Sequence, residues 1–269
     1  MLKLSIITIN YNNAAGLLGT IESVASQTSS DFEYIVIDGG STDESLAIIE
    51  HYKDNITYWI SEPDQGIYHA MNKGIRQAKG EYCQFLNSGD YLLKPDVTER
   101  MLRDMPQCSI SYGNKIREIG GRRIVEKSYA GRQITLMDLY RSTIFHATAY
   151  IKRSLFEQYG FYDESLKIVS DWKFYLITVG LHNEKVAYRD IDMVWFDTQG
   201  ISSTQKELDR QERTEVLQKT LPAPILSDYQ AFAHEGVIIK RLKQNKLCWF
   251  LILNLYRVLF RLDKLRSRE

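Results

Sequence analysis

Residues 4–13, LSIITINYNN, decide the fold of this chain. The segment Leu4–Ile9 is an apolar run rich in β-branched residues, and it has the length of a buried strand. The polar residues Asn10–Asn13 follow it and predict a loop. The run is too short for a secretory leader and lacks a cleavage site, so we expect it to stay in the protein as a first, buried strand.

Strand and helix patterns alternate from this strand onward. Ser41 and Glu44 match the S-x-x-E pattern of a capping box at the start of a helix, and Gly80 is placed to end another. The expected elements are a helix over 17–28, a strand over 34–37, a helix over 41–52, a strand over 56–60, a helix over 67–78 and a strand over 82–86. This order predicts a parallel sheet covered by helices, which binds ligands at the carboxyl ends of its strands.

The second half of the chain is mixed. Gly120-Gly121 between two apolar segments predicts a hairpin. The other expected elements are strands over 145–151, 186–188 and 193–196, helices over 171–179 and 207–219, and two further helices after Pro222 and Pro224.

Composition excludes several classes of protein. The chain has 269 residues, with 44% hydrophobic and 25% charged, which excludes a disordered, collagen-like or coiled-coil protein. Its formal net charge is zero, so we expect no nucleic-acid partner. Cys83, Cys108 and Cys248 lie far apart, so the sequence predicts no disulfide framework and favours a reducing, cytoplasmic location.

Three loops at the predicted strand ends carry the residues suited to chemistry. They hold Thr8, Asn10 and Tyr11, then Asp38 with Gly39-Gly40, then the segment 87–90, NSGD. A nucleotide could stack on the Tyr11 ring, bond Asp38, and share a divalent ion with Asp90. The alternative is that Asp38 and Asp90 are turn or cap residues. The chain has neither GxxxxGK[S/T] nor GxGxxG after the first strand, which argues against a P-loop enzyme and a dinucleotide dehydrogenase.

In order along the chain, SIITINYNN, YIVIDGGSTDES, SEPDQGIYHAMNKGI and FLNSGD resemble glycosyltransferase family 2, and most of all the bacterial transferases that build surface polysaccharide such as O-antigen or capsule. The resemblance continues through SYGN, FHATAYIKRSLFEQYGFYDESL and SDWKF to GISST near Thr204. It implies an α/β GT-A fold over 1–204, with a nucleotide-binding half (1–113) and an acceptor half (114–204). Residues 205–269 would form a helical extension.

The resemblance also implies a set of site residues. The implied nucleotide contacts are Thr8, Asn10, Tyr11, Asp38, Asp64 and Asn72. In NSGD the family's other acids are missing, so Asp90 alone is left as a ligand for Mn²⁺ or Mg²⁺. Many relatives carry Arg where this chain has Met71, and Lys73 is the substitute cation that we expect beside the diphosphate.

The resemblance assigns Asp171 as the general base that deprotonates the acceptor hydroxyl. The pattern alone favours the alternative that Asp171 is an acid at a helix N-terminus, stabilised by the helix dipole. His146 and Trp172 are candidate acceptor contacts, and the alternative for both is a place in the core.

The tail has its own signature. LCWFLILNLYRVLF, residues 247–260, is apolar and flanked by basic residues, and residues 236–269 carry nine Lys/Arg and two Asp/Glu. A stretch of 14 residues is too short to span a bilayer, which needs about 20. We expect residues 240–268 to contact a membrane surface, and the alternative is a core or dimer helix.

Together these observations predict an inverting glycosyltransferase. It would move a sugar from a nucleotide-sugar donor, most simply a UDP-sugar, to a glycan or lipid-linked acceptor in cell-surface polysaccharide synthesis. The enzyme would work in the cytoplasm or at the inner face of the cytoplasmic membrane. Two alternatives stay open: a sugar nucleotidyltransferase, and an inactive nucleotide-binding scaffold.

Overall fold

The computed structural model describes residues 2–198 and 200–266, with no account of the side chains of residues 202, 203 and 263–266. The chain forms two compact units, Met1–Val216 and Leu217–Glu269. The division falls later than the expected boundary at residue 204. Most of helix α9, Lys206–Thr220, therefore belongs to the first unit.

One sheet runs through the first unit, in the order β3-β2-β1-β4-β8-β6-β9-β5 with β7 paired to β6. Strands β1 to β4 are parallel to one another, and β8 runs antiparallel to both β4 and β6. The strands are β1 Leu4–Asn10, β2 Phe32–Asp38, β3 Tyr58–Ser61, β4 Tyr82–Phe85, β5 Tyr91–Leu92, β6 Ile110–Ile119, β7 Arg122–Glu126, β8 Ala149–Lys152 and β9 Val186–Trp195.

Strand β1 lies between β2 and β4, and all seven of its residues are buried. This central position explains why its sequence is a continuous apolar run rather than an alternating one. The predicted parallel sheet with an opening buried strand is confirmed. Its carboxyl edge brings together the loops after β1, β2 and β4.

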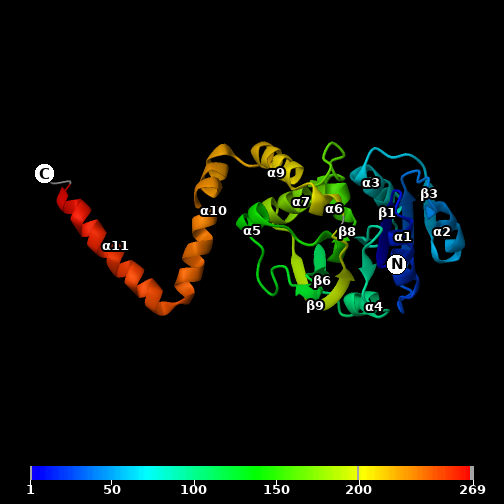
Figure 1. Ribbon diagram of the computed structural model, residues 1–269, viewed down its shortest axis with the longest axis horizontal. Coiled ribbons are helices and arrows are strands. Elements are labelled where there is room, and N and C mark those ends of the chain that lie inside the picture. Colours follow the sequence, from blue (N-terminus) through cyan, green and yellow to red (C-terminus); the bar gives the residue numbers. More distant parts are fainter. Residues whose placement is uncertain (1, 199, 267–269) are drawn as a thin grey trace. The chain divides into compact units, whose positions relative to one another are not determined.

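Helices cover this sheet. In Figure 1 the blue and cyan elements β1–β3 with α1–α3 form one half of the unit, and the green elements β6 and β8 with α5–α7 form the other. The helices are α1 Ala14–Ala25, α2 Ser45–His51, α3 Ile67–Gln77, α4 Val97–Leu102, α5 Leu136–Arg141, α6 Ser154–Tyr159, α7 Ser170–Tyr175 and α8 Ile201–Thr204, with short turns at Lys53–Asn55 and His146–Thr148 and a π-helical turn at Leu176–Leu181.

The structure corrects several local predictions. The two strands expected over 186–196 are one strand, β9, whose register against β6 shifts near Asn114. The capping box is absent, because the Ser41 hydroxyl donates to Asp38 and the cap position Glu44 makes no side-chain cap bond. The hairpin is confirmed: Ile119 pairs with Arg122 across Gly120-Gly121, whose φ angles of +57° and +73° suit glycine.

The second unit contains helices α10, Ala223–Gln244, and α11, Lys246–Arg266, which pack against each other in part. Across residues 2–198 and 200–266, no helix combines the length and the apolar character that crossing a bilayer requires.

Candidate active site

The loops after β1 and β2 are bonded to each other. The Asn12 side-chain oxygen accepts a hydrogen bond from the Thr42 backbone at 2.8 Å, and the Asp43 carboxylate accepts one from the Ala14 backbone at 2.9 Å. These bonds fix the turn that follows β1. Tyr11, at its start, keeps 67% of its surface exposed. The ring therefore stands open at the carboxyl edge of the sheet, as a stacking platform requires.

The segment after β3 passes close against the glycines of the second loop. A methyl group on Gly39 would lie 2.8 Å from Asp64 Oδ2 and 3.3 Å from Tyr11 Cδ2. Gly40 has a φ of +78°, and a methyl group there would lie 3.1 Å from the Pro63 nitrogen. The positive φ and the nearby Pro63 backbone make glycine necessary at Gly40, and Gly39 lies between Tyr11 and Asp64, whose predicted nucleotide contacts stay a prediction.

Asp38 lies beneath these loops rather than facing a ligand. It is fully buried, and its carboxylate accepts hydrogen bonds from Asn10 Nδ2 at 2.8 Å, from Ser61 Oγ at 2.6 Å, and from the Ser41 hydroxyl and backbone at 2.6 and 2.9 Å. Burial acts to raise the pKa of Asp38, but these hydrogen bonds outweigh it and hold the pKa below its ordinary value. The expected direct base contact is therefore corrected: Asp38 ties three loops together.

Thr8 and Asn10 are also buried. The Thr8 hydroxyl donates to the Leu86 carbonyl at 2.7 Å and accepts from the Tyr34 hydroxyl at 2.9 Å, so Thr8 braces β1 against its neighbours and does not reach a nucleotide. The Asn10 amide nitrogen bonds Asp38 and Ser45, while its oxygen has no partner among the described residues. Of these two candidates, only Asn10 keeps an unpaired side-chain acceptor, and that oxygen is buried.

The NSGD loop meets the end of β9. Asp90 is buried, and its Oδ1 accepts a hydrogen bond from the Asp197 backbone at 2.9 Å. A methyl group on Gly89, whose φ is +102°, would lie 2.8 Å from Asp197 Oδ2. Burial raises the pKa of Asp90 to about 7, and the neighbouring Asp197 acts in the same direction. Asp197 was missed from sequence because 107 residues separate it from Asp90.

This pair of carboxylates fits a divalent cation that takes most of its ligands from elsewhere. Mg²⁺ is commonly held by one or two carboxylates plus substrate phosphates. Among the residues that the structure describes, no group of three or more His, Cys, Asp or Glu side chains could hold a metal. Asp90 and Asp197 would thus hold Mg²⁺ or Mn²⁺ only together with a diphosphate and water.

A lysine stands beside this pair. The Lys115 Nζ atom lies 3.9 Å from the centre of the Phe145 ring and 4.4 Å from that of Phe196, and it pairs with Glu126 at 3.1 Å. Burial lowers the pKa of Lys115, while Glu126 and Asp90 oppose that shift. Lys115 is the cation that neighbours Asp90, and sequence reasoning did not find it because no short motif contains both residues.

Lys73 and Asn72 both have partners in the structure. Lys73 pairs with Glu62 at 2.8 Å, so its charge is already balanced by a side chain of the loop. Asn72 is buried and bonds the Tyr162 backbone through both its oxygen and its nitrogen, at 3.1 and 2.9 Å. Asn72 therefore holds α3 in place, which corrects its expected role as a nucleotide contact, while the role of Lys73 stays a prediction.

Asp171 lies in the first turn of α7, half-buried. The Tyr68 hydroxyl lies 2.8 Å from Asp171 Oδ1 and 2.5 Å from the Ile168 carbonyl oxygen, so these two acceptors share its single proton. Tyr68 stands at the start of α3, four residues after Asp64. Burial raises the pKa of Tyr68 well above its ordinary value, and the Asp171 charge adds to this, so Tyr68 stays a donor. One hydroxyl therefore connects the loop near Tyr11 to the predicted base.

The backbone before Asp171 is held from α9. The buried Glu212 carboxylate accepts hydrogen bonds from the backbone nitrogens of Lys167, Ile168 and Val169 at 2.7, 2.9 and 3.3 Å. These donors lie just before α7, whose N-cap Val169 makes no side-chain cap bond. Glu212 therefore positions Asp171, although the sequence placed it in a separate extension.

The two predicted acceptor contacts differ. Trp172 is 1% exposed, donates from Nε1 to the Leu139 carbonyl at 2.7 Å, and lies beneath the Arg213 guanidinium at 4.4 Å. It is a core residue and presents no face to a sugar, which corrects the stacking prediction. His146 is half-buried, stacks on Phe85 and contacts the Tyr162 hydroxyl at 2.9 Å. Burial lowers the pKa of His146 and Asp171 opposes this, so the ring is neutral at pH 7.

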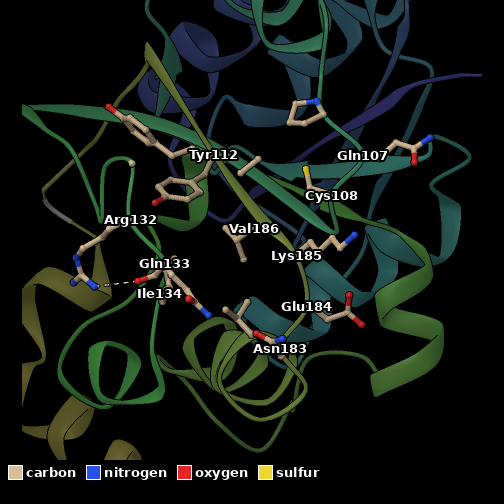
Figure 2. Close-up of a pocket in the computed structure, with 15 residues that line it drawn as sticks. Gln107, Cys108, Tyr112, Arg132, Gln133, Ile134, Asn183, Glu184, Lys185 and Val186 are labelled. Atoms are coloured by element: carbon tan, nitrogen blue, oxygen red, sulfur yellow. Dashed lines mark hydrogen bonds between the residues drawn. The ribbon is translucent and has the colours of Figure 1, made fainter.

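A separate cavity of about 560 Å³ lies where β6 and β9 begin, at the edge opposite the Tyr11 loops. Figure 2 shows Tyr112, Arg132 and Lys185 around it. It contains none of the predicted site residues. The candidate active site is instead the open carboxyl edge that carries Tyr11, Asp64, Asp90 and Asp171.

The mixed sheet covered by helices, with loops gathered at the carboxyl edge of its parallel strands, is a GT-A fold. Residues 5–160 match the model of the family described as Glycosyl transferase family 2. An uncharacterized glycosyltransferase of Mycobacterium tuberculosis is 33% identical over 211 residues, which cover 74% of this chain and 76% of that protein. The chain therefore belongs to glycosyl transferase family 2 and is a transferase enzyme.

Further relatives support this assignment. A Mycobacterium bovis protein named PGL/p-HBAD biosynthesis glycosyltransferase is 32% identical over 63% of this chain and 67% of its own length. Among solved structures, Staphylococcus aureus TarS 1–349 in complex with UDP-GlcNAc is 22% identical with a TM-score of 0.64, and the match covers 82% of this chain and 68% of that one. A Pyrobaculum calidifontis mannosyltransferase in complex with GDP-Man and Mn²⁺ is 15% identical with a TM-score of 0.65, and the match covers 86% of this chain and 70% of that one. At these identities the two structures show the fold alone. The chain spans 60% of TarS 1–349 in its match to the UDP complex.

Proposed function

We propose that this enzyme is an inverting glycosyltransferase that uses a UDP-sugar and a glycan or lipid-linked acceptor. The observation that supports the proposal most is the hydrogen bond between Tyr68 and Asp171, because it holds a carboxylate next to α3, and the loop before α3 carries Asp64 beside Gly39. The relatives add support, since one is named for glycolipid synthesis and others were solved with UDP-GlcNAc or GDP-Man.

In the proposed reaction Asp171 accepts the proton of the acceptor hydroxyl as its oxygen attacks the anomeric carbon. The bond from that carbon to the diphosphate breaks on the opposite face, and the electron pair leaves with UDP. Tyr68 keeps the Asp171 carboxylate oriented throughout. Mg²⁺ or Mn²⁺, when bound at Asp90 and Asp197, supplies positive charge for the leaving diphosphate.

We place this reaction on the cytoplasmic side of the membrane, with the enzyme bound peripherally, because a lipid-linked acceptor is found at that surface. The product would enter a bacterial cell-surface polysaccharide or glycolipid.

Thermal unfolding with UDP, GDP, ADP or CMP, each with Mn²⁺ or with EDTA, tests the donor. A ligand that binds only the folded state raises stability as RT ln(1 + [L]/Kd), about 2.7 kcal/mol at 100 times Kd. We expect a shift with UDP and Mn²⁺ that Asp90→Ala removes and that the matched surface variant Asp54→Ala keeps. If none of the four nucleotides raises the unfolding temperature, the proposal is refuted and a scaffold is favoured. Release of pyrophosphate instead of UDP in an activity assay would favour a nucleotidyltransferase.

A further inference from the structure

Helix α11 exposes an unusual amount of apolar surface. Nine apolar side chains between Leu247 and Leu262 are at least half exposed: Leu247, Phe250, Leu251, Leu255, Tyr256, Val258, Leu259, Phe260 and Leu262. A helix in contact with water normally confines its apolar residues to one buried stripe. A contiguous exposed surface of this kind marks an interaction site.

From Lys246 to Leu262 the polar side chains of α11 share one narrow strip, whereas the sequence places Asp263 and Arg266 outside it. At about 100° per residue, Lys246, Arg257 and Arg261 lie within roughly 60° of one another around the helix axis, and Asn254 extends the strip by about 20°. Phe250 is the one apolar residue inside this basic strip. The apolar residues from Leu247 to Leu262 outside it cover an arc of roughly 240°.

The width of this apolar arc distinguishes two possible partners, a second copy of α11 and a bilayer surface. One partner helix covers a stripe little wider than about 100°, so a second copy of α11 would leave most of the arc in water. A bilayer surface covers a wide arc at once, because the helix sinks to its flanks while the basic strip stays among the headgroups. Residues 236–262 hold six basic residues and no Asp or Glu, so the surface that fits is anionic.

We propose that α11 lies in the plane of an anionic bilayer, with Lys246, Arg257 and Arg261 at the headgroups and Leu251, Leu255 and Leu259 among the acyl chains. The inference goes beyond the transfer reaction. It concerns a helix of the second unit and deepens only the peripheral membrane binding in the proposed function, so a failed test of the donor or the base would leave it intact.

Flotation of the full chain with vesicles tests this. We expect binding to phosphatidylcholine vesicles that contain 30% phosphatidylglycerol, and at least tenfold weaker binding to pure phosphatidylcholine. Arg257→Gln with Arg261→Gln should weaken the binding by roughly 30-fold, which is about 2 kcal/mol at 1.4 kcal/mol per tenfold. Leu255→Ser with Leu259→Ser should weaken it at least tenfold. The matched control, Arg122→Gln with Arg141→Gln, removes two exposed cations of the first unit and should change nothing.

Circular dichroism and thermal unfolding of each variant show whether α11 and the first unit remain folded. Equal binding to neutral and anionic vesicles, or binding that both double variants leave unchanged, would overturn the inference. Sedimentation velocity gives a further test. If the wild type is a dimer, and Leu255→Ser with Leu259→Ser converts it to a monomer while vesicle binding persists, α11 binds a second copy and the inference is overturned.

Discussion

Tyr68 shows how a single residue connects the two halves of the site. Its hydroxyl donates to Asp171 on α7, while its backbone begins the helix that follows Asp64. Sequence reasoning found Asp171 through the SDWKF motif but passed over Tyr68, since a tyrosine in an amphipathic helix has no signature apart from core packing. The bond between them spans 103 residues and exists only in the folded chain.

Asp171→Asn removes the proposed base while keeping the shape of the side chain. We expect kcat to fall by roughly 10²- to 10⁴-fold, because general base catalysis contributes that much. The thermal shift with UDP should stay, since Asp171 does not touch the Tyr11 loops. Steady-state transfer assays measure the loss, and Asp54→Asn is the control. Near-wild-type kcat in Asp171→Asn would remove this residue from the mechanism.

Asp38 makes the stability of the enzyme depend on pH. Its folded pKa lies below the unfolded value of about 3.9, so its contribution is present above that pH and is lost as the pH falls through the folded pKa. Asp38→Asn should therefore lower the free energy of unfolding by about 1–3 kcal/mol at pH 7. Urea unfolding should show a smaller difference from wild type at pH 3. A difference that does not change with pH would contradict the assignment.

At the scale of elements, the loop after each strand is shaped by its neighbours. Gly40 is required because its φ is +78° and the Pro63 nitrogen passes 3.1 Å from where a methyl group would stand, and a methyl group on Gly39 would force the Asp64 side chain to move. Similarly, α7 begins where Glu212 of α9 accepts three backbone hydrogen bonds. A helix that looked like a polar extension in the sequence is thus part of the site.

Glu212→Gln tests this positioning role. Neutralising the carboxylate weakens the three hydrogen bonds, so we expect a stability loss of about 1–3 kcal/mol and a several-fold fall in kcat with little change in the donor KM. Glu215→Gln, an exposed change on the same helix, should leave both unchanged. If Glu212→Gln lowers stability but leaves kcat intact, Glu212 supports the fold and not the base.

At the scale of the whole molecule, we expect the buried side chains of the sheet to contribute most of the free energy of unfolding. Ile6 in β1 is fully buried, whereas Leu255 in α11 is 61% exposed. Ile6→Ala should lower the free energy of unfolding by about 2–5 kcal/mol, because it removes buried methyl groups and leaves a cavity. Leu255→Ala should change it by less than about 0.5 kcal/mol. Urea unfolding followed by tryptophan fluorescence compares them, and equal losses would show that α11 is buried in solution.

The sequence by itself determined the parallel sheet, the order of its helices, the exposed place of Tyr11 and the family. These follow from local patterns, because a buried strand, a helix face and a loop motif each consist of residues close together in the chain. Tertiary structure alone decided which side chains face the open edge. In the folded chain Asp38 and Thr8 are buried beneath the loops, and Trp172 packs in the core. Lys73 pairs with Glu62, and Asn72 bonds the Tyr162 backbone. Tertiary structure also set Asp197 and Lys115 beside Asp90, because long-range pairing of β6 and β9 carries them there.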